Sequence, residues 1–261
     1  MDSRLLGNDE YSCDVCTLVG IARAQAAFVA PDYSVCRILS SITLEVNNME
    51  ITWLGHACFR LKGKDATVLT DPYDKSVGYQ LGRPTADIVT VSHHHFDHDA
   101  VSAVGGNPRV IDGPGEYEIK GVMIVGIQTF HDAEGGKKRG KNTVYLIEMD
   151  DIVICHLGDL GHVLSAEQVE AMSNVDVLLI PVGGNYTINA AQAAEVISLI
   201  EPRIVIPMHY KTDVVKLEID PVEKFAREMG IKSLQPQPKL MITKSTLPSE
   251  QQIIVLEYRK G

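Results

Sequence analysis

The stretch Ser92-His93-His94-His95-Phe96-Asp97-His98-Asp99 follows the apolar run at residues 87–91 and is unusually rich in histidine and aspartate. It places four imidazoles and two carboxylates within seven residues, a density that random surface composition rarely produces. Imidazole nitrogen and carboxylate oxygen are the ligands that zinc and similar metals bind. A polar loop after a buried strand also rests on a rigid base. The stretch therefore predicts a metal site; the alternative is a polar turn with adventitious histidines.

Composition limits the class of protein. The chain has 261 residues, is 45% hydrophobic and carries a net charge of −10, with 24 Lys and Arg against 34 Asp and Glu. An acidic surface is a poor partner for nucleic acid or an anionic membrane. The five cysteines form no evident disulfide framework, and neither a membrane-spanning run nor a signal peptide is recognisable. We therefore expect a cytoplasmic protein of one large domain or two small ones.

Two regions differ in pattern. Residues 1–48 lack clear alternation and contain a lone Cys13-X-X-Cys16 pair, so we interpret them as an N-terminal extension of unknown role, either a packed appendage or a partly disordered tail. Residues 49–261 begin with short apolar runs and change after Asp159 to alternating strands and helices. Early strands followed by later βα units predict an α/β (α+β) domain, with two packed sheets and helices outside.

The expected elements follow from apolar runs and capping signals. Ser165 with Gln168, and Asn189 with Gln192, have the form of helix-capping pairs. Helices are expected at 165–172, 189–199 and 220–230. Strands are expected at 51–54, 57–61, 67–70, 87–91, 110–111, 122–128, 143–149, 152–155, 175–180, 203–206, 240–242 and 253–256.

Three further polar residues stand at the ends of apolar runs. They are His131, Asp159 and His209. A single histidine at a strand end is commonly a hydrogen-bonded structural residue. Together with the first stretch, however, these positions supply five histidines and two aspartates as candidate ligands. That set is sufficient for two metal ions that share a carboxylate.

The order of these residues carries a resemblance. His93-X-His95-X-Asp97-His98, followed by His131, Asp159 and His209, resembles the metallo-β-lactamase fold superfamily of metallo-hydrolases over residues 49–261. Further stretches resemble zinc-dependent hydrolases related to the ascorbate-6-phosphate lactonase-like proteins: 53–57, 113–117, 129–132, 139–143, 156–161 and 207–210. The resemblance implies a four-layer αββα sandwich with the site along one edge of the sheets. His131 departs from the Gly-His-Thr setting common elsewhere in the superfamily.

The resemblance also implies a division of ligands between two divalent ions, zinc being expected and manganese or iron being alternatives. One ion would take His93, His95 and His131. The other would take Asp97, His98 and His209, with Asp159 bridging both. Three neutral nitrogens leave an open position on a Lewis acid for water, whose pKa falls to about 7 when a metal binds it. Asp97, if its second oxygen is free, would act as a catalytic proton shuttle.

Residues outside the ligand set are candidates for orienting ligands or binding substrate, because each imidazole needs a partner on its other nitrogen. His56 and Asp71 are expected near the site or in turns. Arg139 and Asn142 follow a Gly-rich loop and would bind an anion such as phosphate, or form a solvated turn. Tyr186 and Lys211 would line the cleft or face solvent.

The expected function is that of a binuclear metal-dependent hydrolase that uses a metal-bound hydroxide on a small ester, lactone or phosphodiester. Its partner would be a small-molecule substrate, an anionic one included, and not nucleic acid or a membrane; the sequence is compatible with a homo-oligomer. Alternatives are a metal-dependent nuclease, which requires a positive groove, a non-catalytic metal-binding regulatory protein, and an iron-dependent oxidoreductase.

Overall fold

The computed structural model describes residues 48–259. These residues belong to one compact unit. The expectations for residues 1–47, including the Cys13 and Cys16 pair, lie outside the described residues. Within residues 48–259, no helix combines the length and the apolar character required to cross a bilayer.

The first sheet has six strands in the order β12-β1-β2-β3-β4-β5. Their bounds are β1 Met49–Gly55, β2 Cys58–Lys62, β3 Thr67–Thr70, β4 Ile88–Thr90, β5 Arg109–Ile111 and β12 Leu240–Ile242. β3 and β4 pair in parallel. Parallel strands end at the same edge of a sheet, so Asp71, directly after β3, lies beside the polar stretch that follows β4.

The second sheet has seven strands in the order β13-β11-β10-β9-β8-β7-β6. Their bounds are β6 Gly115–Ile119, β7 Val122–Phe130, β8 Lys141–Met149, β9 Ile152–His156, β10 Val177–Pro181, β11 Ile204–Met208 and β13 Gln252–Ile253. β7 and β9 are both antiparallel to β8, and β9, β10 and β11 are parallel to one another. β7, β9 and β11 therefore end at one edge, where His131, Asp159 and His209 follow them.

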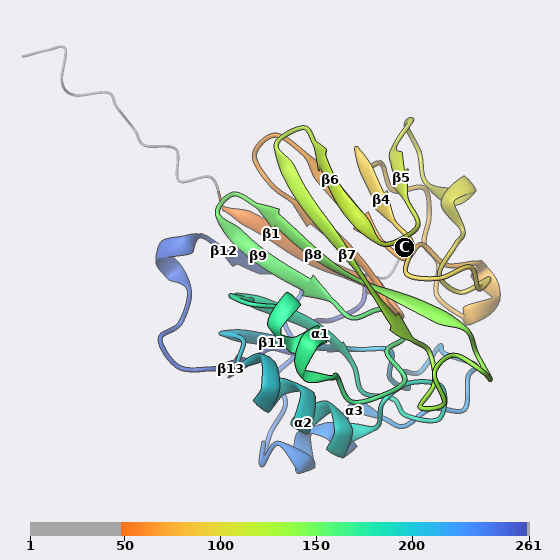
Figure 1. Ribbon diagram of the computed structural model, residues 1–261, viewed down its shortest axis with the longest axis vertical. Coiled ribbons are helices and arrows are strands. Elements are labelled where there is room, and N and C mark those ends of the chain that lie inside the picture. Colours follow the sequence, from red (N-terminus) through yellow and green to blue (C-terminus); the bar gives the residue numbers. More distant parts are fainter. Residues whose placement is uncertain (1–47, 260–261) are drawn as a thin grey trace, which may run out of the picture. The chain divides into compact units, whose positions relative to one another are not determined.

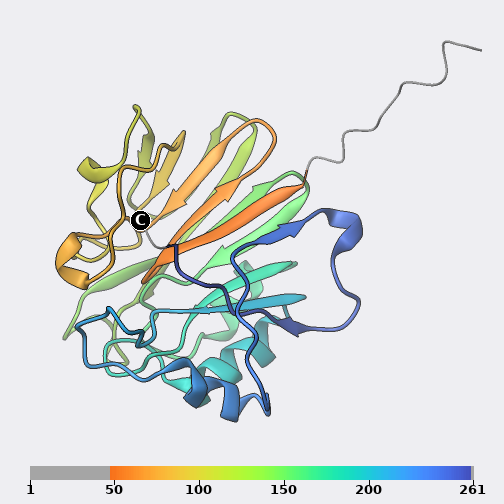
Figure 2. The same cartoon turned by 180° about the vertical axis from the view of Figure 1, so that it is seen from behind.

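Three α-helices cover the second sheet on the side that faces away from β1–β3 (Figures 1 and 2). They are α1 Ala166–Ala171, α2 Ala190–Ile200 and α3 Val222–Glu228. α1 and α2 begin at the expected capping pairs, in which Ser165 and Asn189 each accept a bond from the backbone three residues on. These caps satisfy amide groups that have no partner inside the helix.

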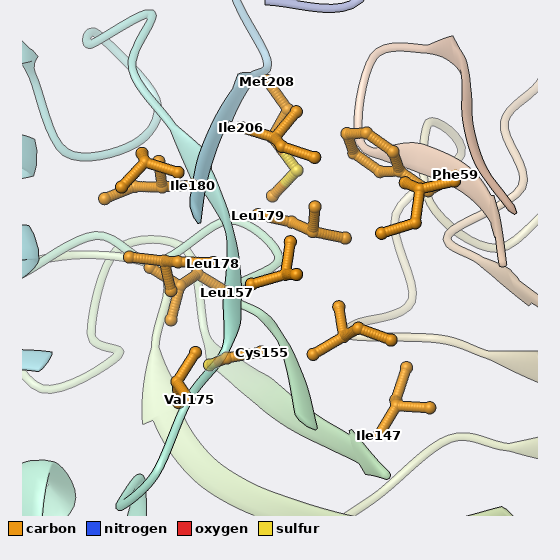
Figure 3. Close-up of a cluster of buried hydrophobic side chains, with 14 of the residues drawn as sticks. Phe59, Ile147, Cys155, Leu157, Val175, Leu178, Leu179, Ile180, Ile206 and Met208 are labelled. Atoms are coloured by element: carbon orange, nitrogen blue, oxygen red, sulfur yellow. The ribbon is translucent and has the colours of Figure 1, made fainter. Parts of the chain in front are cut away.

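The main core lies between the sheets, and Figure 3 shows Phe59 of β2 facing Leu179 and Met208 of the second sheet. Neighbouring residues of a strand point to opposite faces. Val68 therefore packs in this core, whereas Leu69 packs in a second cluster on the outside of the first sheet. Loops and the 3₁₀ turns η2 (Lys75–Val77) and η3 (Val101–Ala103) supply this outer layer. The expected sandwich of two packed sheets is confirmed.

Candidate metal centre

The edges of the two sheets bring all seven expected ligands into three overlapping groups. One group contains His93, His95 and His131, and another contains His93, His98 and Asp159. The third contains Asp97, His98, His209 and, in addition, His56. Within each group the candidate ligand atoms lie within 4.8 Å of one another.

Asp159 stands between the groups. Its Oδ1 lies 3.2 Å from His98 Nε2 and 3.4 Å from His209 Nε2, whereas its Oδ2 lies 3.4 Å from His131 Nε2. Two ligand atoms that bind one zinc ion at ordinary bond lengths and a tetrahedral angle lie about 3.4 Å apart. Each carboxylate oxygen therefore faces a different set of imidazoles, as a bridging carboxylate requires.

The His56 ring is directed toward the group formed by Asp97, His98 and His209. Its Nε2 lies 3.3 Å from Asp97 Oδ2, and its ring centroid lies 4.2 Å from that of His209. The backbone holds it there: the His56 carbonyl accepts bonds from Trp53 Nε1 and the His209 amide. His56 and His209 both have positive φ angles, 54° and 51°, a conformation that strains residues other than glycine. His56 thus joins the second group of candidate ligands, and its Nε2 also lies within hydrogen-bond distance of Asp97.

Asp71 orients two ligands from behind. It is fully buried, and its carboxylate accepts from the Ser92 amide at 2.8 Å, from Ser92 Oγ at 2.6 Å and from His98 Nδ1 at 2.8 Å. Ser92 Oγ also lies 2.9 Å from His93 Nδ1. Because the hydroxyl donates its one proton to Asp71, it accepts from His93 Nδ1–H. Both imidazoles therefore direct Nε2 toward the centre, and Ser92 is a candidate positioning residue that sequence reasoning did not single out.

Asn142 positions Asp159 instead of reaching solvent. It is fully buried, its Oδ1 accepts from the Asp159 amide at 2.9 Å, and its Nδ2 donates to Thr129 Oγ1 and to the Leu157 carbonyl. Lys211 Nζ donates to the Leu217 carbonyl at 2.7 Å, so its ammonium group is held by a neighbouring loop. Of the four expected substrate contacts, the structure brings together Arg139 and Tyr186 and directs Asn142 and Lys211 elsewhere.

Several buried atoms at the centre have no hydrogen-bond partner among residues 48–259: His93 Nε2, His98 Nε2, His209 Nε2 and Asp159 Oδ1. A buried polar atom without a partner costs about 1–3 kcal/mol. Native structures contain few such atoms, and their concentration at one point needs an explanation. Metal ions would satisfy all four, so the residues present fit a metal centre.

Two candidate ligands, His56 and His93, have the neutral state that metal binding requires, whereas His98 would have to release a proton when a metal binds. Burial lowers the pKa of His56 to about 4 and that of His93 to about 3, so both imidazoles are neutral near pH 7. Burial opposes protonation of His98, but Asp159 and Asp71 outweigh it and raise the pKa of this imidazole. The pKa of Asp159 lies well below its usual range despite burial, because His209 and His98 face its carboxylate. By contrast, His94 belongs to none of the three groups of candidate ligands: it is exposed and bonds to the Asp99 carboxylate.

Comparison with known proteins agrees with this geometry. A model of the beta-lactamase superfamily domain matches residues 50–209. The chain belongs to the metallo-β-lactamase superfamily. Superfamily relatives described as metal-dependent hydrolases include one from Thermoplasma acidophilum, 29% identical over 74% of this chain and 97% of its own length. Another, from Thermoplasma volcanium, is 31% identical over 73% of this chain and 96% of its own.

A solved structure shows the same metallo-β-lactamase fold. It is described as a candidate Zn-dependent hydrolase of this superfamily from Thermotoga maritima, and is 44% identical to the present chain. The match covers 80% of this chain and 98% of that one, with a TM-score of 0.67. The resemblance inferred from the sequence is confirmed, and the chain is a metal-dependent hydrolase of the metallo-β-lactamase fold.

Proposed function

We propose that this metal-dependent hydrolase binds two divalent ions, zinc being the expected metal and manganese or iron the alternatives, and that it cleaves a small ester, lactone or phosphodiester. The observation that carries the proposal is the position of Asp159. Its two oxygens face different imidazoles, His131 on one side and His98 with His209 on the other. With a single ion, either His131 or the pair His98 and His209 would have no metal to bind.

The ligands divide between the two ions. His93, His95 and His131 would hold the first ion, and Asp97, His98, His209 and His56 the second, with Asp159 shared. His56 extends the set implied by the resemblance, so the second ion would have more protein ligands than the first. When bound, the ions would acidify a water molecule and polarise the carbonyl or phosphoryl group of the substrate.

The protein's own residues hold this arrangement and move the proton. Asp71 and Ser92 fix the orientation of His98 and His93, and Asn142 fixes the backbone of Asp159. Asp97 Oδ2 faces His56 and His98, whereas no donor among residues 48–259 bonds to its Oδ1. We assign Oδ1 the role of accepting a proton from the attacking water and returning it to the leaving group.

Metal removal and reconstitution tests the proposal. Hydrolysis of a panel of phenyl esters, lactones and bis(4-nitrophenyl) phosphate should be lost after chelation and restored by zinc, manganese or iron(II). His93→Ala and Asp159→Ala should abolish it, whereas His94→Ala, which changes an exposed imidazole of the same stretch, should not. Hydrolysis that survives chelation or persists in Asp159→Ala would contradict the proposal.

A further inference from the structure

Two loops are anchored beside the bridging carboxylate. The first, residues 132–140, follows His131, and the second comprises residues 183–188. Both are tied to the segment that carries Asp159. The Gly161 amide donates to the Phe130 carbonyl at 2.9 Å, and the Ile188 amide donates to the Leu160 carbonyl at 2.9 Å. Both loops are therefore anchored within two residues of Asp159.

The 132–140 loop is built around one carboxylate. Asp132 Oδ1 accepts from the amides of Glu134 and Gly136, and its Oδ2 accepts from those of Lys138 and Arg139, all at 2.8–2.9 Å. The base of the loop is closed by the His131 amide, which donates to the Gly140 carbonyl at 3.0 Å. The Arg139 backbone is therefore fixed relative to a ligand of the first ion.

The 183–188 loop is fixed relative to a ligand of the second ion. A Cβ on Gly183 would lie 2.1 Å from the His209 carbonyl oxygen, so only glycine fits this close approach. The Asp220 amide donates to the Gly183 carbonyl at 2.7 Å, and Asn185 Nδ2 donates to the Glu218 carbonyl at 2.8 Å. These bonds hold the part of the loop that presents Tyr186.

Arg139 joins the two loops. Its guanidinium carbon lies 4.8 Å from the centroid of the Tyr186 ring, and its Nη2 donates to the Asn185 carbonyl at 3.3 Å. Neighbouring Lys138 is paired with Glu134, whereas no carboxylate in the described part of the chain lies within salt-bridge distance of Arg139. A guanidinium has five N–H donors. Most N–H groups of the Arg139 guanidinium are therefore free to bind a ligand, and its positive charge has a fixed position but no counter-ion among the described residues.

We propose that Arg139, held in place by Tyr186, binds a carboxylate or phosphate group of the substrate whose scissile bond lies at the metal centre. This inference rests on the proposed hydrolytic function and narrows it to anionic substrates. The planar guanidinium matches both anions with two parallel hydrogen bonds. The aromatic face restricts the long side chain, so less conformational entropy is lost when the anion binds.

Three matched phenyl acetates test the inference: 4-acetoxybenzamide, which is neutral, 4-acetoxybenzoate and 4-acetoxyphenyl phosphate. Acetate release is measured with the zinc-loaded protein and with Arg139→Gln, Arg139→Lys and Tyr186→Leu. For the anionic esters, Arg139→Gln should lower kcat/KM by about 10- to 100-fold, mainly through KM. For the neutral ester, kcat/KM should stay unchanged. Arg139→Lys should restore part of the loss, and Tyr186→Leu should cause a smaller one.

Lys137→Gln is the control variant, because it removes a positive charge from an exposed position of the same loop. An equal loss in Lys137→Gln and Arg139→Gln, or an equal effect of Arg139→Gln on neutral and anionic esters, would overturn the inference while hydrolysis itself stands. If the wild type cleaves none of the esters, the proposed activity on esters fails. In that case, calorimetric titration with phenylphosphonate tests the anion site in the zinc-loaded wild type and in Arg139→Gln. A tenfold higher Kd in Arg139→Gln supports the site, and an equal Kd refutes it.

Discussion

Replacing Ser92 by alanine isolates the hydrogen bond that orients the first ligand. The hydroxyl donates to Asp71 Oδ2 at 2.6 Å and accepts from His93 Nδ1 at 2.9 Å. Ser92→Ala removes both bonds and leaves the His93 ring free to change its tautomer and its orientation. The backbone amide of residue 92 and His98 Nδ1 still donate to Asp71, so the buried carboxylate keeps two of its three partners.

The size of the effect follows from these contacts. Because Asp71 is not left unpaired, we expect the unfolding free energy of the metal-free protein to fall by only about 2 kcal/mol. Loss of the partner of a metal-binding imidazole weakens metal binding by about 10- to 100-fold. That factor corresponds to about 1.4–2.7 kcal/mol in binding free energy. The loss should fall on the ion held by His93, His95 and His131.

Competition with a chromogenic chelator measures the affinity of each of the two proposed zinc ions, and denaturant unfolding of the metal-free protein measures stability. We expect Ser92→Ala to weaken one ion and to leave the other within a few-fold of the wild type. His94→Ala is the control, since it removes an exposed imidazole of the same stretch. If Ser92→Ala lowers stability but leaves both zinc affinities unchanged, the assigned role of the hydroxyl is wrong.

Three further predictions concern the support of the centre. Asn142→Ala removes three buried hydrogen bonds and leaves the Asp159 amide and the Leu157 carbonyl without the side chain that pairs them, so it should lower the unfolding free energy by about 3–5 kcal/mol, measured by urea unfolding; an unchanged midpoint would contradict this. Gly161→Ala should weaken the ion held by His131 in the chelator assay, because the new Cβ would lie 2.3 Å from the His131 carbonyl carbon; wild-type affinity would refute the packing. Acidification should destabilise the metal-free protein between pH 6.5 and 4. Burial lowers the folded pKa values of His56 and His93 to about 4 and about 3, so in this range the unfolded chain binds more protons, and each group should lower stability by about 1 kcal/mol per pH unit. The raised pKa of His98 adds little slope below about pH 6, where this group is protonated in both states, and a flat stability curve between pH 6 and 4 would count against neutral buried imidazoles.

Much of this arrangement follows from the sequence, because the candidate ligands stand where strands end. The parallel pairs β3–β4 and β9–β10–β11 then bring those ends to common edges. The strand β6 was not expected, since Gly113-Pro-Gly115 is typical of a turn and the exposed edge strand after it shows no buried face. The strand expected at 253–256 is short, and only Gln252 and Ile253 pair with β11.

The positions that sequence reasoning could not assign depend on backbone detail. His56 follows an irregular register between Trp53 and Gly55 and adopts a positive φ, and these features direct its ring toward Asp97. Asn142 was interpreted as part of a loop after a Gly-rich turn, but β8 already begins at Lys141, so its side chain is fixed beneath Asp159. Neither feature produces a hydrophobic periodicity or a motif spacing that the sequence displays.

The proposed function requires that Asp159 bridges two ions. Its most direct test is anomalous diffraction from crystals of the zinc-reconstituted protein, with the metal content of the same preparation measured by mass spectrometry. We expect two zinc ions per chain, one peak among His93, His95 and His131 and one among Asp97, His98 and His209, with one Asp159 oxygen toward each. A single peak at full zinc loading, or a carboxylate of Asp159 that contacts only one ion, would contradict it.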